Sequence, residues 1–150
     1  MTATVRVGEV GDAEALAALR WRRVTQERGY DGDNREEFVA ALRNWMAAHA
    51  DTHIPFVAEK DGTVVGMAWL MVGARVPTPG AYERRFGDVQ SVFVVPELRN
   101  DGIGALLIGK LLETADAKGL EHVTVHSSER AVAFYRRLGF GYQETSLIRD

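Results

Sequence analysis

The sequence contains no cysteine, which excludes disulfide bonds, cysteine nucleophiles and cysteine-ligated metal sites. It has no apolar run approaching the ~20 residues that span a membrane, and its first residues lack the apolar segment of a secretion signal. The net charge is only −3, so the overall charge indicates neither a nucleic-acid partner nor an anionic membrane. These absences together predict a cytoplasmic enzyme or binding domain.

The composition that remains is ordinary for a globular protein, with 46% hydrophobic and 26% charged residues among 150 positions. This length predicts one domain, residues 1–150, that is large enough to bury a core. Apolar periodicity and turn signals predict the elements in the following order. They are a strand around Val5 and Val7 that could include Val10, a helix capped by Asp12 that stops by Gly29, a helix at 35–48, strands at 56–59, 63–72 and 88–95, a helix from Gly102 to Lys118, a strand at 123–125, a helix capped by Ser127 or Ser128 that ends at Gly139, and a last strand at 141–148.

The segment 99–104, Arg-Asn-Asp-Gly-Ile-Gly, joins an apolar strand to a helical pattern. The first turn of a helix has N–H groups without internal partners, and glycines let an anion approach them closely. The segment is therefore a candidate phosphate cradle, although Gly102 and Gly104 could also form only a turn and a tight helix start. A dinucleotide fingerprint fits poorly because Leu107 stands where a third glycine is expected, and no Gly-Lys-Ser/Thr of a Walker loop follows.

Two motifs in this order resemble those of one enzyme family. Residues 94–104 read V-x-P-x-x-R-x-x-G-x-G, which resembles the acetyl-coenzyme A motif of the GCN5-related N-acetyltransferases (GNAT family). Residues 131–140, AVAFYRRLGF, resemble the later Ala-x-x-Phe/Leu-Tyr-x-x-Leu-Gly-Phe segment of that family. The resemblance implies an α/β fold with a mixed sheet, in the order β-α-α-β-β-β-α-β-α-β, and acetyl-CoA as cosubstrate.

The resemblance also implies which residues hold the cofactor. The backbone of Phe93, Val94 and Val95 would lie along the pantetheine arm. Ser128 stands where many members have an asparagine that contacts the pantetheine, so a shorter hydroxyl replaces it. The diphosphate would lie on the backbone amides of Asn100, Asp101, Gly102, Ile103, Gly104 and Ala105, with Arg99 beside it. Ala131 and Tyr135 of the second motif complete the expected cofactor-binding set. No metal is implied, and the four histidines show no ligand spacing.

Acetyl transfer to an amine requires a base for the amine and an acid for the departing thiolate. Within the second motif Tyr135 is the candidate acid, although a packed helix tyrosine is the alternative. Many members carry a glutamate as base where this sequence has Gln90, which could only position a water. Asp88 is the nearest carboxylate and could instead be an ordinary strand-start aspartate. Histidine has a suitable pKa, so His126 is another candidate, but a lone histidine at a strand end is more often a structural residue.

The predicted activity is direct acetyl transfer from acetyl-CoA to a primary amine of a small molecule or peptide. Alternatives are a non-catalytic acyl-CoA sensor and an enzyme that uses a longer acyl group. A homodimer is possible. In this family the acceptor is bound by the first two helices and the loop before the central strand, which gives as candidates Arg20, Trp21, Arg23, Tyr30, Trp45, Trp69 and residues 82–85. The arginines suit an acidic acceptor, whereas Glu83 and Asp88 suit a cationic amine, and the sequence does not choose between them.

Overall fold

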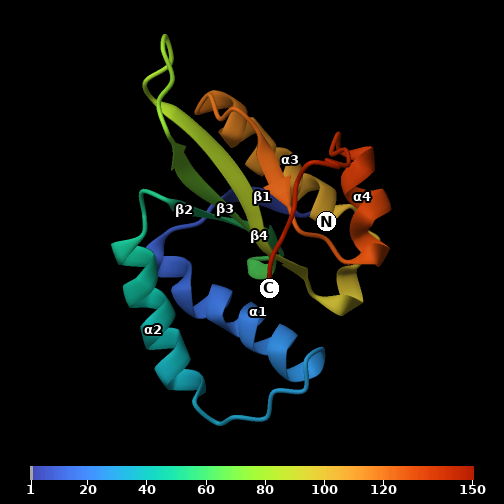
Figure 1. Cartoon of the computed structure of the whole chain (residues 1–150). Coiled ribbons are helices and arrows are strands. Elements are labelled where there is room, and N and C mark those ends of the chain that lie inside the picture. The colour runs from blue at the N-terminus through green and yellow to red at the C-terminus, as the bar shows by residue number, and fades with distance from the viewer. Residues whose placement is uncertain (1) are drawn as a thin grey trace.

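The structure, a computed structural model, describes residues 2–150 and contains one five-stranded sheet in the order β1-β2-β3-β4-β5. Neighbouring strands from β1 to β4 are antiparallel, whereas β4 and β5 are parallel. Helices α1 and α2 lie on one side of the sheet, and α3 and α4 on the other (Figure 1). In chain order the elements are β1 (Thr4–Val7), α1 (Ala13–Gln26), α2 (Arg35–Ala48), β2 (His53–Lys60), β3 (Thr63–Arg75), β4 (Arg84–Val94), α3 (Ile103–Ala117), β5 (Val123–Val125) and α4 (Val132–Arg137).

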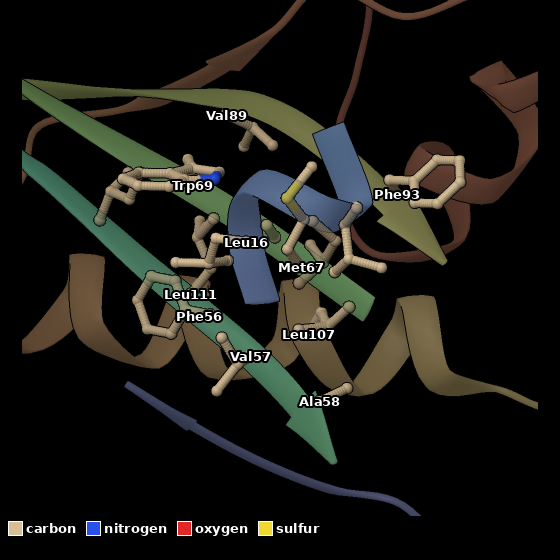
Figure 2. Packing of buried hydrophobic residues seen from close by; sticks show 14 of the residues in the cluster. Leu16, Phe56, Val57, Ala58, Met67, Trp69, Val89, Phe93, Leu107 and Leu111 are labelled. Carbon is tan, nitrogen blue, oxygen red and sulfur yellow. The ribbon is translucent and has the colours of Figure 1, made fainter. Parts of the chain in front are cut away.

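The core lies between the sheet and its flanking helices. Leu16 of α1 and Leu107 and Leu111 of α3 are fully buried, as are Phe56 of β2 and Met67 of β3. Figure 2 shows these apolar side chains around the central strands. Burial of such side chains stabilises a fold by roughly 1.5–3 kcal/mol each, so this layer holds α1 and α3 against the two faces of the sheet. Within residues 2–150, every helix is too short or too polar to cross a bilayer.

Turn chemistry confirms the predicted hairpin between β2 and β3. Asp61 and Gly62 have φ values of 54° and 78°, the left-handed conformation that a two-residue hairpin turn requires at both positions. Helix α2 also has the predicted bounds. Strands β3 and β4 are longer than predicted because they pair with each other as far as Arg75 and Arg84.

Two predicted helix caps are wrong. Asp12 precedes α1, but its side chain accepts no bond from that helix and instead binds the N–H of Glu9 and the guanidinium of Arg6. Ser128 likewise makes no capping bond, and the hydroxyl of Ser127 donates to the carbonyl of Ser128. In both places another local partner competes for the capping side chain.

The expected last strand at 141–148 does not form, and this prediction is wrong. No ladder partner pairs with these residues, and they are exposed. Tyr142, Leu147 and Ile148 gave the segment its apolar character, yet they are 72%, 91% and 75% exposed. Strand formation depends on a paired edge and a packed face more than on the residue types themselves.

Replacing Asp12 with Asn should lower the melting temperature at pH 7 by a few degrees. The variant loses the charged hydrogen bonds between this carboxylate and Arg6, and a local interaction of this kind contributes about 1 kcal/mol. Hydrogen bonds from Arg6 and from the N–H of Glu9 lower the pKa of Asp12. The carboxylate therefore stabilises the fold fully above about pH 4, and this contribution is lost as the pH falls through the lowered pKa. Thermal denaturation at pH 7 and at pH 2.5 checks this. Asp51→Asn, an exposed position, is the control, and an equal loss for both variants at pH 7 would contradict the assignment.

Candidate functional site

A cavity of about 880 Å³ opens where β4 and β5 separate. The two strands pair only from Gly87 to Val89, with Val123 to Val125 as partners. Beyond Val89, β4 continues to Val94 without a partner strand on this side. Its unpaired edge forms one wall of the cavity, and the end of α1, the loop after β4, the first turn of α3 and the segment from β5 through α4 form the others.

A β-bulge in β4 lies at the start of this unpaired edge, directly after the part of β4 that pairs with β5. Ser91 has a φ of 51°, and the pairing with β3 shifts by one residue there. Bulges bend a strand and re-aim its side chains, and they occur frequently beside active sites. The bulge thus bends β4 at the point where the cavity wall begins.

The backbone of β4 alternates between β3 and the cavity. The N–H of Val95 donates to the carbonyl of Val65 at 3.0 Å, so this donor is used within the sheet. Because hydrogen-bonded and non-bonded pairs alternate in an antiparallel ladder, the polar groups of Val94 and Val92 point away from β3. A strand-like partner in the cavity would therefore pair with Val92 and Val94. The backbone of Phe93, Val94 and Val95 was predicted to lie along the cofactor. The polar groups of Phe93 and Val95 face β3 instead, whereas those of Val94 remain available on the cavity side.

The loop that precedes α3 presents free backbone donors. Gly102 has a φ of 82° and no side chain caps the helix. No acceptor among residues 2–150 pairs with the N–H groups from Asn100 to Ala105, and the first bonded amide is that of Leu106, to Gly102. A Cβ at Gly102 would meet no atom within 4 Å. Open space in front of unpaired donors at a helix N-terminus is an arrangement that binds an anion.

Gly104 allows close packing between two helices. A Cβ at this position would lie 3.3 Å from the ring of Phe134, which is tighter than ordinary van der Waals contact. The absent side chain therefore lets the first turn of α3 approach α4 closely. Phe134 precedes Tyr135, so this contact also fixes the helix that carries the candidate acid.

Tyr135 is 8% exposed and lines the cavity. Its ring packs edge-to-face against Phe134 and Phe140, with centroids 5.0 and 5.6 Å away. Burial raises the pKa of Tyr135, and the nearby guanidinium of Arg23 opposes this shift. The phenol is thus protonated at neutral pH and can donate a proton into the cavity.

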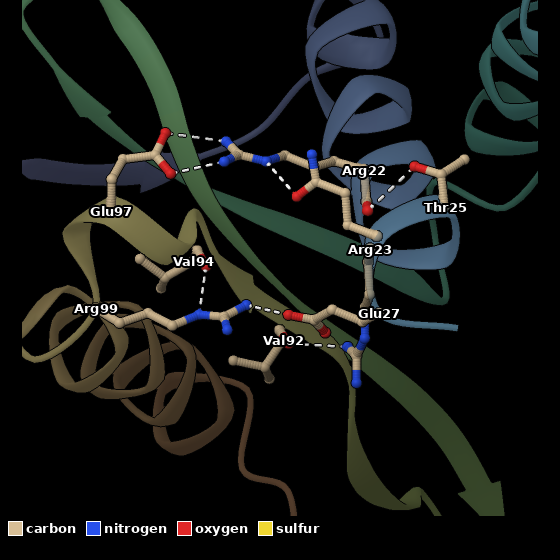
Figure 3. Close-up of polar contacts among 9 residues, drawn as sticks. Arg22, Arg23, Thr25, Glu27, Val92, Val94, Glu97 and Arg99 are labelled. Carbon is tan, nitrogen blue, oxygen red and sulfur yellow. Dashed lines mark hydrogen bonds and ion pairs between the residues drawn. The ribbon is translucent and has the colours of Figure 1, made fainter. Parts of the chain in front are cut away.

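Two arginines hold the carbonyls on the unpaired edge of β4. Arg23 of α1 donates from Nη1 to the carbonyl of Val92 at 3.0 Å, and Arg99 donates from Nε to that of Val94 at 2.9 Å. Arg99 also binds Glu27 at 2.5 Å, and its guanidinium lies 5.2 Å from the ring centroid of Phe93. Figure 3 shows Arg99 reaching across to Glu27, the residue that follows α1.

Several residues of the cavity wall were not predicted from the sequence. Glu27, Arg130 and Arg137 line it, and Arg23, expected in the acceptor region, does so too. Glu27 could have been found from its position four residues after Arg23, at the C-terminal end of α1 and on the same side of the helix. With Arg99, the wall carries four arginines and one carboxylate, which favours an anionic ligand.

Most of the predicted cofactor residues lie together on this wall. They are Phe93, Val94, Arg99, Asn100, Gly102, Ile103, Gly104, Ala105, Ser128, Ala131 and Tyr135, and His126 lies there as well. Val95 and Asp101 do not line the cavity.

The two base candidates, Asp88 and Gln90, lie outside the cavity wall, immediately before the bulge. Gln90 donates to one oxygen of Asp88 at 3.2 Å, and the hydroxyl of Thr124 donates to the other at 2.6 Å. Because side chains alternate along a strand, both face the same side of the sheet, opposite to Val89. Their role as base stays a prediction.

The predicted acceptor residues divide into separate groups. Trp45 and Trp69 pack together, with centroids 6.0 Å apart, and His49 and His53 join them. Trp21 and Tyr30 form another aromatic pair at 5.5 Å, whereas residues 82–85 lie at the far end of β4, where Arg84 binds Glu121. Only Arg20 and Arg23 reach the bulge, because Arg20 donates to the hydroxyl of Ser91 at 2.7 Å.

Known proteins resemble this chain over most of its length. The model of the acetyltransferase (GNAT) family matches residues 16–140. A glucosamine 6-phosphate N-acetyltransferase of Trypanosoma brucei brucei is 35% identical over 95 residues, which are 63% of each protein. A mycothiol acetyltransferase of Streptomyces coelicolor is 32% identical over 96 residues, covering 62% of this chain and 28% of that protein. The chain thus matches less than two thirds of the length of these relatives.

Solved structures show the same fold. An acetyltransferase structure from Trypanosoma brucei has a TM-score of 0.77 and 26% identity, covering 99% of both chains. A predicted acetyltransferase of Clostridium acetobutylicum, solved with acetyl-CoA, has a TM-score of 0.78 at 19% identity, over 99% of this chain and 96% of that one. The predicted mixed α/β architecture is thereby confirmed.

Proposed function

Since this chain belongs to the acetyltransferase (GNAT) family, we propose that it is an acetyl-CoA-dependent N-acetyltransferase that moves the acetyl group directly to a primary amine. One observation carries this proposal. Free N–H groups from Asn100 to Ala105 lie at one end of a cavity whose walls include an unpaired strand edge and the buried Tyr135. A diphosphate, an extended amide arm and a thioester require these three features in that combination.

The residues present fit acetyl-CoA. The free amides and the open space at Gly102 suit its diphosphate, and the cationic wall suits its negative charge. The polar groups of Val92 and Val94 on the cavity side suit the amides of the pantetheine arm, much as an added strand would. Arg23 and Arg99 now occupy these two carbonyls, and a carbonyl can accept a second bond.

Acetyl-CoA supplies a thioester carbonyl that an amine can attack. Tyr135 would donate its proton to the departing sulfur, and the N–H of Val94 would stabilise the negative charge that develops on the carbonyl oxygen. The amine must first lose a proton, and Asp88, or a water held by Gln90, would accept it. Solvent then returns the proton to Tyr135. No acyl-enzyme is needed, because the amine attacks the thioester directly.

A small-molecule amine is the acceptor class that we favour over a peptide. Both relatives described above are named for small molecules. Residues 1–150 would act as one acetyltransferase domain in the cytoplasm. A homodimer stays a prediction from the sequence.

The test is release of free thiol when the protein is mixed with acetyl-CoA and a panel of amines. We expect thiol release that requires both the protein and an amine, and mass spectrometry should find the acetylated amine. Calorimetry with acetyl-CoA alone is the second measurement. No binding of acetyl-CoA would contradict the proposal.

Gln90 favours a second candidate function, because it cannot accept a proton where many family members have a glutamate. A non-catalytic sensor would bind acetyl-CoA yet release no thiol with any amine of the panel. An enzyme for a longer acyl group would instead show its preference when acetyl-, butyryl- and hexanoyl-CoA are compared with one amine.

A further inference from the structure

Two arginines on α1 meet the bulge of β4. Arg20 and Arg23 are one helical turn apart and point to the same strand, where they bind the hydroxyl of Ser91 and the carbonyl of Val92. Both are partly buried. Arg23 and Ser91 line the cavity, and Arg20 adjoins its wall through the bond to Ser91, on the side of the sheet that α1 covers.

Neither arginine has a carboxylate partner in the part of the chain that the structure describes, residues 2–150. The ion pairs found there belong to Arg6, Arg22, Arg75, Arg84 and Arg99. Glu27 is the acid that attracts Arg23, but its carboxylate is bound to Arg99. The Nε of Arg23 is buried and has no hydrogen-bond partner.

Repulsion adds to the cost of this arrangement. Burial lowers the pKa of Arg20 and of Arg23, and the charge of Arg28 lowers both further. Partly buried cations without a counter-charge are unfavourable, and an anion bound by both arginines would reduce this electrostatic cost. Arg20 uses one of its five N–H donors on Ser91, so a pair remains for a carboxylate or a phosphate.

The bond to Ser91 places Arg20 away from the proposed site of the cofactor phosphates. Ser91 precedes Val95 by four residues of strand, about 13 Å, and the free amides lie beyond Val95. An anion at Arg20 would thus lie at the acyl end, where the amine must enter. The diphosphate would occupy the other end of the cavity.

We propose that Arg20 and Arg23 form an anion-binding subsite for the acceptor, so that the amine acetylated by this protein carries a carboxylate or a phosphate. This inference rests on the proposed function. Arg20 orients the acceptor by binding its anionic group. Arg23 also contacts that group, and its bond to Val92 ties it to the unpaired edge of β4, where the thioester is proposed to lie.

The test is calorimetry on the protein saturated with coenzyme A, which fills the phosphate sites of the cofactor. The probes are two matched pairs, glucosamine 6-phosphate with glucosamine, and 4-aminobutyrate with 4-aminobutyramide. At least one anionic amine should bind ten or more times more tightly than its neutral partner. Equal affinity within both pairs, or no binding of either anionic amine, would overturn the proposal.

The variant Arg20→Met should reduce that preference to within about twofold and leave the affinity for coenzyme A unchanged. Arg20→Lys, which keeps the charge, should retain part of it. Arg43→Met removes the same charge from an exposed position on α2 and should retain the full preference. A loss of affinity for both members of a pair in Arg20→Met would show a structural role only and overturn the proposal.

A second comparison distinguishes the acceptor from the acyl group as the source of the anion. If Arg20→Met weakens succinyl-CoA tenfold relative to acetyl-CoA, the anion belongs to the acyl group and the acceptor assignment is wrong. Failure of the proposed function gives a different result, because coenzyme A itself would then not bind.

Discussion

Gly102→Asp is expected to weaken acetyl-CoA binding at least ~100-fold, which corresponds to about 2.7 kcal/mol. The new carboxylate would project into the open space before the free amides, where the diphosphate is proposed to lie. Two like charges about 4 Å apart near a protein surface repel by up to ~4 kcal/mol, so the electrostatic cost alone reaches this size. The left-handed backbone at Gly102, with its φ of 82°, adds strain for a side chain, although Asn and Asp tolerate this conformation better than most residues.

Two controls separate these causes. Gly102→Asn has a similar size without the charge and tolerates the left-handed conformation, so it should lose far less affinity. Gly62→Asp imposes the same backbone strain at a φ of 78° in the β2–β3 turn, away from the cavity, and should lower stability but not affinity. Titration calorimetry measures the affinity for acetyl-CoA, and scanning calorimetry measures the stability of each variant. Unchanged affinity in Gly102→Asp would refute the phosphate assignment.

Tyr135→Phe is expected to reduce kcat by ~10²–10⁴, the usual contribution of a positioned acid, with little change in the affinity for acetyl-CoA. The ring remains to pack against Phe134 and Phe140, so the fold should persist. Only the proton donor is removed. The reaction would then depend on expelling an unprotonated thiolate.

The pH dependence has a definite sign. An acid acts in its protonated form, and burial raises the pKa of Tyr135 above its ordinary value near 10. Tyr135 therefore contributes no loss of kcat between pH 7 and pH 9, and any fall in that range belongs to another group. Tyr142→Phe, at an exposed tyrosine, is the control and should keep full activity. A normal kcat in Tyr135→Phe would leave Tyr135 with a packing role alone.

Local signals in the sequence predicted those parts of the fold that depend on neighbouring residues. The turn at Asp61 and Gly62 follows from the conformations these two residues tolerate, and the bounds of α2 follow from its apolar spacing. The missing strand at 141–148 shows the limit of such signals. Tyr142 and Ile148 look like strand residues, yet no neighbouring edge pairs with them.

The candidate site shows the same division. Contiguous motifs located Gly102 and Tyr135, because each motif is read along a single stretch of chain. The bonds from Arg23 to Val92 and from Arg99 to Glu27 join residues that are 69 and 72 positions apart. Their meeting depends on how α1 crosses the sheet, which periodicity does not specify. The separation of β5 from β4 after Val89 is likewise a property of tertiary packing.

The close approach of Gly104 to Phe134 has a mechanical consequence. Helix α4 has only six residues, too few to hold its own position, so its neighbours determine where it stands. One of these neighbours is the first turn of α3, whose amides face the cavity. The ring of Phe134 lies between that turn and the adjacent Tyr135, so the position of the phenol depends on the position of the turn. If the proposed function holds, the part of the protein that binds the diphosphate also sets the place of the proton donor.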